Sequence, residues 1–145
     1  MNILEYKKKL VRARAGLNQE VAKIILKFEK EIVDLVRLQQ LFERGIDGSG
    51  KKITPEYSPF TVAVKRIKGD TSDHVTLFDK GNLFKSFTTD YGSFILEIFP
   101  TDFKADDLIE KYGKSIFWAT VEHEKVINFN IIMPQLQIWF KNIMK

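Results

Sequence analysis

The most regular feature of the chain is a set of apolar residues spaced three and four apart near its N-terminus. They are Leu17, Val21, Ile24, Ile25, Phe28, Ile32 and Leu35. This spacing places them along one stripe of an α-helix and predicts a helix over about residues 18–37. Asn18 suits its N-cap, and Gly16 predicts a break from a short helix over residues 2–14. We expect residues 1–37 to form a helical arm.

Glycine and polar residues then interrupt the pattern. Three glycines and an aspartate within residues 45–50 predict a loop or hairpin that continues to residue 56. Ser58 followed by Pro59 is typical of a helix N-cap with proline in the first turn, and predicts a short helix that ends at Gly69. Residues 69–73 are polar and predict a loop.

The middle of the chain is rich in β-branched and aromatic residues, which favour strands. We expect the sheet to include Val75, Leu77 and residues 83–88 and 93–99. A tight turn at Tyr91 and Gly92 would join the last two runs as an antiparallel hairpin. Because side chains alternate along a strand, the apolar residues of each strand should lie on one face of that strand. These residues are Phe94, Leu96 and Ile98 on one strand, and Leu83 and Phe87 on its partner.

The C-terminal third predicts two further helices. Residues 105–112 form a short one, with Gly113 as its C-cap glycine. The C-terminal stretch fits both the helical and the strand period. Ile127, Phe129 and Ile131 alternate with asparagines, as in a strand. Helical spacing covers more of it, and we favour a helix kinked at Pro134. The helical set is Val126, Phe129, Ile132, Met133, Leu136, Trp139, Phe140 and Ile143.

The whole pattern predicts one α+β domain over residues 1–145. The helical arm of residues 1–37 precedes an α+β body of residues 38–145, in which short helices pack on a small antiparallel sheet and a C-terminal helix follows. A length of 145 residues suits a single core, and 44% hydrophobic with 29% charged residues excludes a disordered or fibrous chain.

Other function classes are disfavoured by composition. No run approaches the ~20 apolar residues of a membrane-spanning helix, and the N-terminal segment lacks a signal-like apolar run, so we expect no membrane association. The chain has no cysteine, which excludes disulfides, thiol nucleophiles and cysteine-bound zinc and fits a cytosolic origin.

The net charge of +4 lies entirely in the first 14 residues, because the rest of the chain has as many acidic as basic side chains. The basic residues of this arm are Lys7, Lys8, Lys9, Arg12 and Arg14. They could contact DNA or an acidic neighbour weakly through salt-dependent attraction, or form a solvated helix face. Both interpretations stay open.

No motif predicts an active site. Residues 45–52 resemble a phosphate-binding loop, but Lys52 replaces the hydroxyl that would bind magnesium. As a calcium loop starting at Asp47, the same stretch would place Lys51 at a ligand position, where its charge repels the ion. The two histidines, His74 and His123, have carboxylates beside them but no paired ligand spacing, and solvated loop histidines are common. We expect no catalysis, cofactor or metal.

Several segments, taken in order, resemble the small virion-morphogenesis proteins of tailed bacteriophages, which include tail-completion and head-to-tail joining proteins. The resemblance covers residues 40 to about 117. In that family an element of the form Thr-Gly-x-Leu-x-x-Ser enters a strand, and Lys80-Gly81-Asn82-Leu83-Phe84-Lys85-Ser86 is similar to it, with Lys80 in place of the threonine. The other segments are Gln40-Leu41, residues 45–51, Tyr57-Ser58-Pro59-Phe60-Thr61 with Lys65, and residues 75–87.

The resemblance implies a structural subunit of a virion neck or tail, made in the host cytoplasm, that forms an oligomeric ring and contacts connector or tail proteins. We expect these contacts from the arm and from loops 45–56 and 69–82. Besides the basic residues of the arm, the residues expected to contact partners are Asp47, Lys51, Tyr57, Lys80 and Asn82. Trp118, Trp139 and Phe140 are of a type enriched at interfaces, although Trp139 and Phe140 could equally fill the core.

Overall fold

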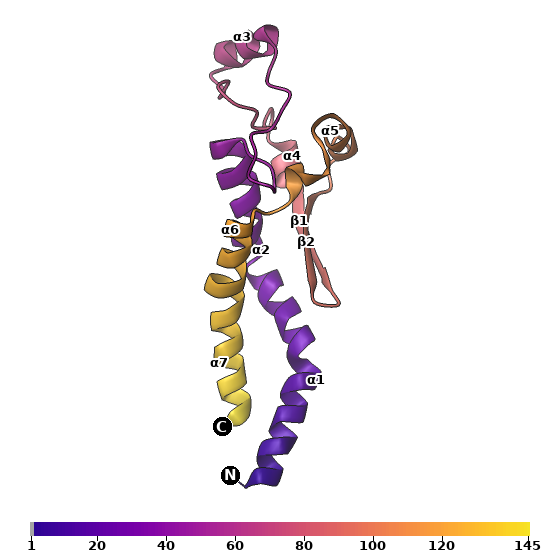
Figure 1. The fold of residues 1–145 in the computed structure, drawn as a ribbon, viewed down its shortest axis with the longest axis vertical. Helices are drawn as coiled ribbons and strands as arrows, with labels where there is room; N and C mark the ends of the chain where they lie inside the picture. The colour runs from indigo at the N-terminus through magenta and orange to yellow at the C-terminus, as the bar shows by residue number, and fades with distance from the viewer. Residues whose placement is uncertain (1) are drawn as a thin grey trace.

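The computed structural model describes residues 2–145 and is elongated, with a small mixed body above two long helical columns (Figure 1). Both termini lie at the end remote from the body. The first column contains α1 (Ile3–Lys27), α2 (Glu29–Asp34) and the π-helical η1 (Leu35–Arg44). The second contains α6 (Val121–Lys125), the π-helical η3 (Val126–Ile132) and α7 (Met133–Met144). The predicted α+β class and both terminal helices are confirmed.

The body lies between the columns in sequence and contains one antiparallel hairpin with four short helices. The hairpin pairs β1 (Phe87–Gly92) with β2 (Ile95–Pro100), in a register that runs from Phe87 opposite Pro100 to Gly92 opposite Ile95. The helices are α3 (Pro59–Lys68), α4 (Asn82–Lys85), α5 (Ala105–Tyr112) and the 3₁₀ turn η2 (Lys114–Phe117).

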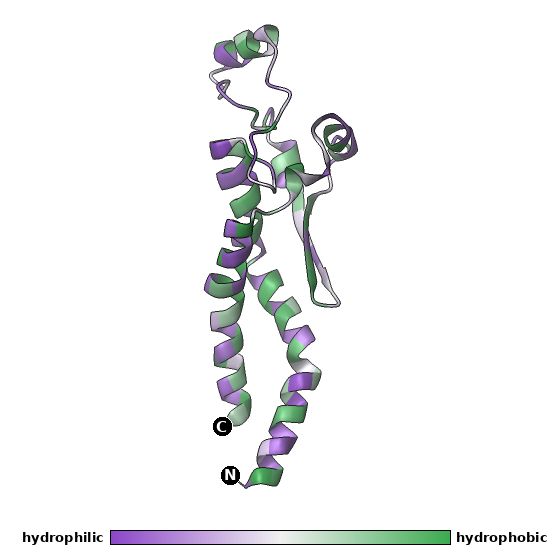
Figure 2. Cartoon of the chain, in the orientation of Figure 1, coloured by the Kyte–Doolittle hydropathy of each residue, from purple (hydrophilic) through white to green (hydrophobic). Residues whose placement is uncertain are grey.

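Two apolar clusters hold these elements together. The body cluster joins η1 to α4, the hairpin and η2 through buried residues such as Leu41, Phe84, Phe87 and Ile116. The junction cluster lies where the columns meet, around Val21, Ile25, Ile32, Leu35 and Ile127. Figure 2 shows apolar residues distributed along the outlying parts of both α1 and α7 as well.

The predicted break at Gly16 is wrong, because α1 runs through it without interruption. Its N-cap is Asn2, not Asn18: the Asn2 side chain accepts from the Glu5 N–H at 2.9 Å, and the Glu5 carboxylate accepts from the Asn2 N–H at 3.3 Å. Trp139 of α7 lies against Gly16. A single helical glycine costs only about 1 kcal/mol, which this cap and packing offset.

The predicted end of the first helical segment at residue 37 is also wrong, since η1 continues to Arg44 and ends at Gly45 in the left-handed conformation. The buried residues of η1 explain the error. Leu35 and Gln40 are five apart, as are Val36 and Leu41. This is the spacing of a π-helix, which a search for a 3.6-residue period does not detect.

The hairpin is confirmed, but three details of the predicted sheet are wrong. Val75 and Leu77 lie in irregular chain, and Leu83 belongs to the helical turn α4 rather than to a strand. The connecting turn is Ser93-Phe94, not Tyr91-Gly92, and both turn residues have positive φ, 52° and 61°. Phe94 is therefore 69% exposed at the hairpin tip instead of facing the core.

Other predictions are confirmed. Ser58 caps α3 by accepting from the Thr61 N–H, and Gly69 ends that helix. Helix α5 spans residues 105–112 as predicted. The C-terminal stretch is helical throughout, with Pro134 in the first turn of α7 directly after the π-helical segment, where its missing N–H is tolerated.

Candidate interaction surfaces

The basic residues of the arm surround α1 rather than forming one face. At roughly 100° per residue, Lys8 and Arg12 point to one side while Lys7 and Arg14 point to another. All four are exposed. Lys9 differs, because its Nζ donates to the Met144 carbonyl at 3.4 Å and so links α1 to the C-terminal end of α7. This distribution is typical of a solvated helix more than of a surface built for nucleic acid.

Asp47 organises the loop that follows η1. Its carboxylate accepts from the Ser49 and Lys51 N–H groups at 2.9 and 3.1 Å and from the Ser49 and Ser115 hydroxyls. Partial burial raises the pKa of Asp47, but these hydrogen bonds outweigh it and hold the pKa below its usual value. The exposed Lys51 side chain is the part of this loop that remains available for a partner.

Gly48 fixes the loop against the body. Its N–H donates to the Ser115 carbonyl at 2.7 Å, and a Cβ at this position would lie 2.4 Å from the Trp118 Cβ. A close backbone approach therefore explains the glycine at this position of the loop.

Tyr57, Lys80 and Asn82, predicted to contact partners, meet in one pocket of about 350 Å³ beside α3. We call it the basic pocket, because four lysines and a single aspartate line it. These residues are Lys65, Lys68, Lys80, Lys104 and Asp79. The structure thus brings together three of the predicted residues, whereas Asp47, Lys51 and the arm lie outside this pocket.

Helix α3 is attached to the body mainly through this pocket. Lys65 donates to the Phe78 carbonyl at 2.7 Å, and its ammonium lies 4.9 Å from the centre of the Tyr57 ring. Lys68 pairs with Asp79 at 3.4 Å. No residue of α3 is buried, and Figure 1 shows the helix projecting at the end of the molecule opposite the termini.

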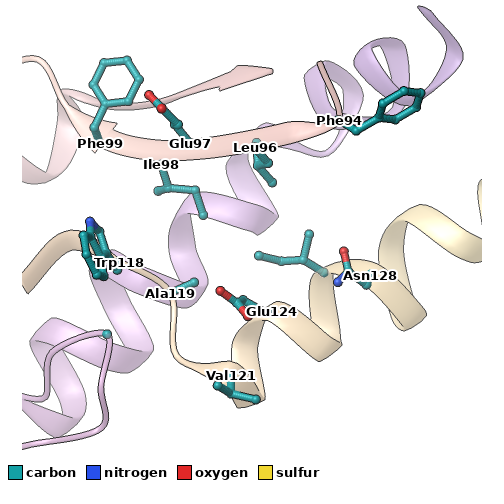
Figure 3. A pocket seen from close by; sticks show the side chains of 12 residues that line it. Phe94, Leu96, Glu97, Ile98, Phe99, Trp118, Ala119, Val121, Glu124 and Asn128 are labelled. Carbon is teal, nitrogen blue, oxygen red and sulfur yellow. The ribbon is translucent and has the colours of Figure 1, made fainter. Parts of the chain in front are cut away.

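A second, larger hollow lies between β2 and the start of the C-terminal column. We call this cavity of about 730 Å³ the hairpin groove. In Figure 3, Leu96 and Ile98 point from β2 toward the helix, Glu124 points up from α6, and Trp118 and Phe94 stand at opposite ends. Glu97 and Phe99 lie on the other side of the strand, at the rim.

The hairpin groove is apolar and exposed, with acidic groups but no lysine or arginine among its lining residues. Trp118 is 61% and Val121 65% exposed. Trp118 is predicted from the sequence to be an interface residue, but the groove is not, because the predicted turn at Tyr91 and Gly92 places Phe94 inside a strand. Of the other two aromatics, Phe140 is 40% exposed and Trp139 is half-buried.

A buried polar network supports the floor of this region. Gln40 donates to the Trp118 carbonyl at 2.6 Å and accepts from the Thr120 N–H at 3.1 Å, and its oxygen lies 3.3 Å from His123 Nδ1. Burial lowers the pKa of His123. The charge of Arg44 lowers this pKa further, and the charge of Glu122 partly offsets the decrease. The buried imidazole is therefore neutral near pH 7. His74, the other histidine, contacts the Phe42 carbonyl at 2.7 Å.

Within residues 2–145, no group of three or more histidine, aspartate and glutamate side chains is placed to hold a metal ion. The same residues include no helix with the length and apolar character needed to cross a membrane. Comparisons with protein-family models, with curated proteins and with solved structures found no match to this chain.

Proposed function

We propose that the protein is a structural subunit of a phage-like particle that forms a ring at the junction of head and tail and works through protein–protein contacts. The observation that carries the proposal is that the single chain exposes more surface than a compact domain of its mass, with large apolar side chains in that surface. Segments of residues 40–117 resemble those of tail-completion and head-to-tail joining proteins in the same order. This resemblance is the reason for proposing a phage-like particle.

The exposed area supports an assembling subunit. The chain exposes 9704 Å². A compact monomer of its mass would expose about 7,700 Å², so the surplus of about 2,000 Å² is comparable to the total area that a standard protein–protein interface buries. Three separate regions contribute large apolar side chains to the surface. They are Ile3, Leu4 and Val11 on α1, Phe60 and Ile67 on α3, and Phe94, Trp118 and Val121 at the hairpin groove.

The chemistry of the pockets fits binding better than catalysis. In the basic pocket, Lys65 contacts a carbonyl and a ring and Lys68 pairs with a carboxylate, and the buried histidine is bonded to Gln40. A ring subunit instead needs two different, complementary faces. The basic end formed by α3 and the acidic hairpin groove meet that requirement.

Light scattering tests the proposal directly. The purified chain should give a discrete oligomer well above its 16.9 kDa mass as concentration rises, at both low and high salt, and electron microscopy should show rings. A chain that stays at the monomer mass over the full concentration series, and that binds no neck or tail component, contradicts the proposal.

A nucleic-acid-associated role is the second candidate, favoured by the location of the whole net charge on residues 1–14. It predicts DNA binding that weakens steeply with salt and disappears when residues 1–14 are deleted. Binding that persists without the arm, or no binding at low salt, excludes it.

A further inference from the structure

The α3 helix presents an apolar stripe that the chain itself leaves uncovered. Phe60, Ala63 and Ile67 follow the i, i+3, i+7 spacing that puts side chains on one helix face. Phe60 is 78% and Ile67 87% exposed. Helices of this length are marginal in water by themselves, and α3 has no buried residue, so a partner surface would complete its packing.

The charge next to this stripe is basic. Arg66 is exposed and lies beside the stripe on the helix surface. Lys65 and Lys68 lie on the side of the helix that faces the basic pocket. No acidic residue occurs in α3. An amphipathic helix of this kind fits an apolar groove that carries carboxylates.

The hairpin groove of the same chain has those properties. Its floor is formed by Leu96, Ile98 and Ile127, and Glu124 points into it. Its volume of about 730 Å³ is ample for the pair of large side chains that α3 presents. At the hairpin tip, Phe94 is held 69% exposed with φ of 61°, because the two-residue turn requires positive φ at both of its residues.

We infer that the α3 stripe of one copy docks in the hairpin groove of the next copy, with Arg66 facing Glu124. This contact rests on the proposed function and names the two surfaces that build the ring. The stripe and the groove lie on different parts of one subunit, so the contact is heterologous and each copy has one stripe and one groove to offer. Docking of the stripe in the groove would bury part of the surplus surface that the single chain exposes.

Two single substitutions separate the surfaces. Ile67→Glu places a charge in the stripe, and Val121→Lys places a like charge opposite Arg66 in the groove. Each should reduce the assembly to the 16.9 kDa chain. Ile138→Glu is the matched control, because Ile138 is 56% exposed on α7, outside the stripe and the groove, and its substitution should leave the assembly unchanged. Circular dichroism of each variant checks that the fold is retained.

Mixing the two variants tests the pairing itself. Ile67→Glu keeps a working groove and Val121→Lys keeps a working stripe, so an equal mixture should form dimers and stop there. Because the chain has no cysteine, Ile67→Cys in one chain and Val121→Cys in another should also form a disulfide between chains, whereas Ile67→Cys with Ile138→Cys should not.

The outcomes distinguish this contact from the proposed ring. Wild-type rings that persist in Ile67→Glu, or a mixture that remains monomeric, overturn the contact alone. Open filaments that dissociate in Ile67→Glu uphold the contact and contradict the ring. A wild-type chain that stays monomeric over the full concentration series contradicts the contact, and it also contradicts the ring if it binds no neck or tail component.

Discussion

Gln40 shows how one side chain can position a functional surface. It is fully buried and bonds to backbone groups on both sides of Ala119, at the point where the chain enters α6. These bonds fix the segment that carries Trp118 and Val121 on the groove wall. A polar residue at this depth is tolerated because its amide oxygen and nitrogen are both satisfied.

Replacing Gln40 with leucine should destabilise the fold by about 2–4 kcal/mol, since the Thr120 N–H and Trp118 carbonyl would each lose a buried partner. Urea denaturation measures the change. Gln39→Leu is the matched control, because Gln39 is exposed and its substitution should have an effect within about 0.5 kcal/mol. Equal midpoints for the two variants would contradict this role of Gln40.

Gly48 offers a second test at the same scale. Alanine there would place its Cβ 2.4 Å from the Trp118 Cβ and 2.8 Å from the Trp118 carbonyl oxygen, so the loop must move away. Overpacking of this kind costs about 1–3 kcal/mol. Thermal unfolding should detect it, whereas Gly92→Ala, which meets nothing within 4 Å, should change little. A Gly48→Ala variant as stable as Gly92→Ala would show that the close approach is unimportant.

Among the elements, the hairpin is attached to the helical column by apolar packing and by hydrogen bonds to one carboxylate. Glu29 accepts from the Thr88 hydroxyl at 2.8 Å and from the Thr89 N–H and hydroxyl at 2.9 and 3.2 Å. The hydrogen bond from Thr88 and those from Thr89 outweigh burial and lower the pKa of Glu29 from its usual 4.5. Because the groove lies between the hairpin and the helices, this attachment sets its width.

This lowered pKa predicts a pH dependence. The stabilising contribution of Glu29 is complete above its unfolded pKa near 4.5 and is lost as pH falls through the lower, folded value. Glu29→Gln should therefore be about 1 kcal/mol less stable than wild type at pH 7 and should lose less stability on acidification. Chemical denaturation at several pH values from 3 to 7 measures both effects.

Glu31→Gln is the control for that experiment. Glu31 lies in the same first turn of α2, so both substitutions remove one carboxylate from the same part of the chain. Glu31 is exposed, and its substitution should leave the pH dependence as in wild type. Parallel pH curves for wild type and Glu29→Gln would contradict the attachment.

The elements also show what the sequence could and could not predict. Helix caps could be predicted where the residue type determines the cap, as at Ser58, Gly69 and Gly113. The π-helical segments and the Ser93-Phe94 turn were not, because tertiary packing selects a five-residue spacing and a positive φ that local preferences disfavour. The basic pocket was predicted only in part. Tyr57, Lys80 and Asn82 were predicted to contact partners, but the α3 lysines that line the same pocket were not.

On the scale of the whole molecule, the helical columns extend the chain far beyond its body. The columns contact each other near the junction cluster and again through Lys9 and Met144, and apolar residues on α1 remain exposed between and beyond these points. Such a shape leaves a single chain with much of its apolar surface in water. Its stability should therefore depend on neighbours more than that of a compact domain does.

A subunit stabilised by assembly should unfold at a higher temperature when it is more concentrated, because binding of folded copies to each other withdraws them from the unfolding equilibrium. For a chain of this size, we expect a tenfold rise in concentration to increase Tm by about 3–6 °C. Fluorescence of Trp118 and Trp139 can follow unfolding from 1 to 100 µM. Ile67→Glu should show a Tm independent of concentration, and Ile138→Glu should behave as wild type. A constant wild-type Tm over this range would mean that the exposed apolar surface is not buried by other copies of the chain.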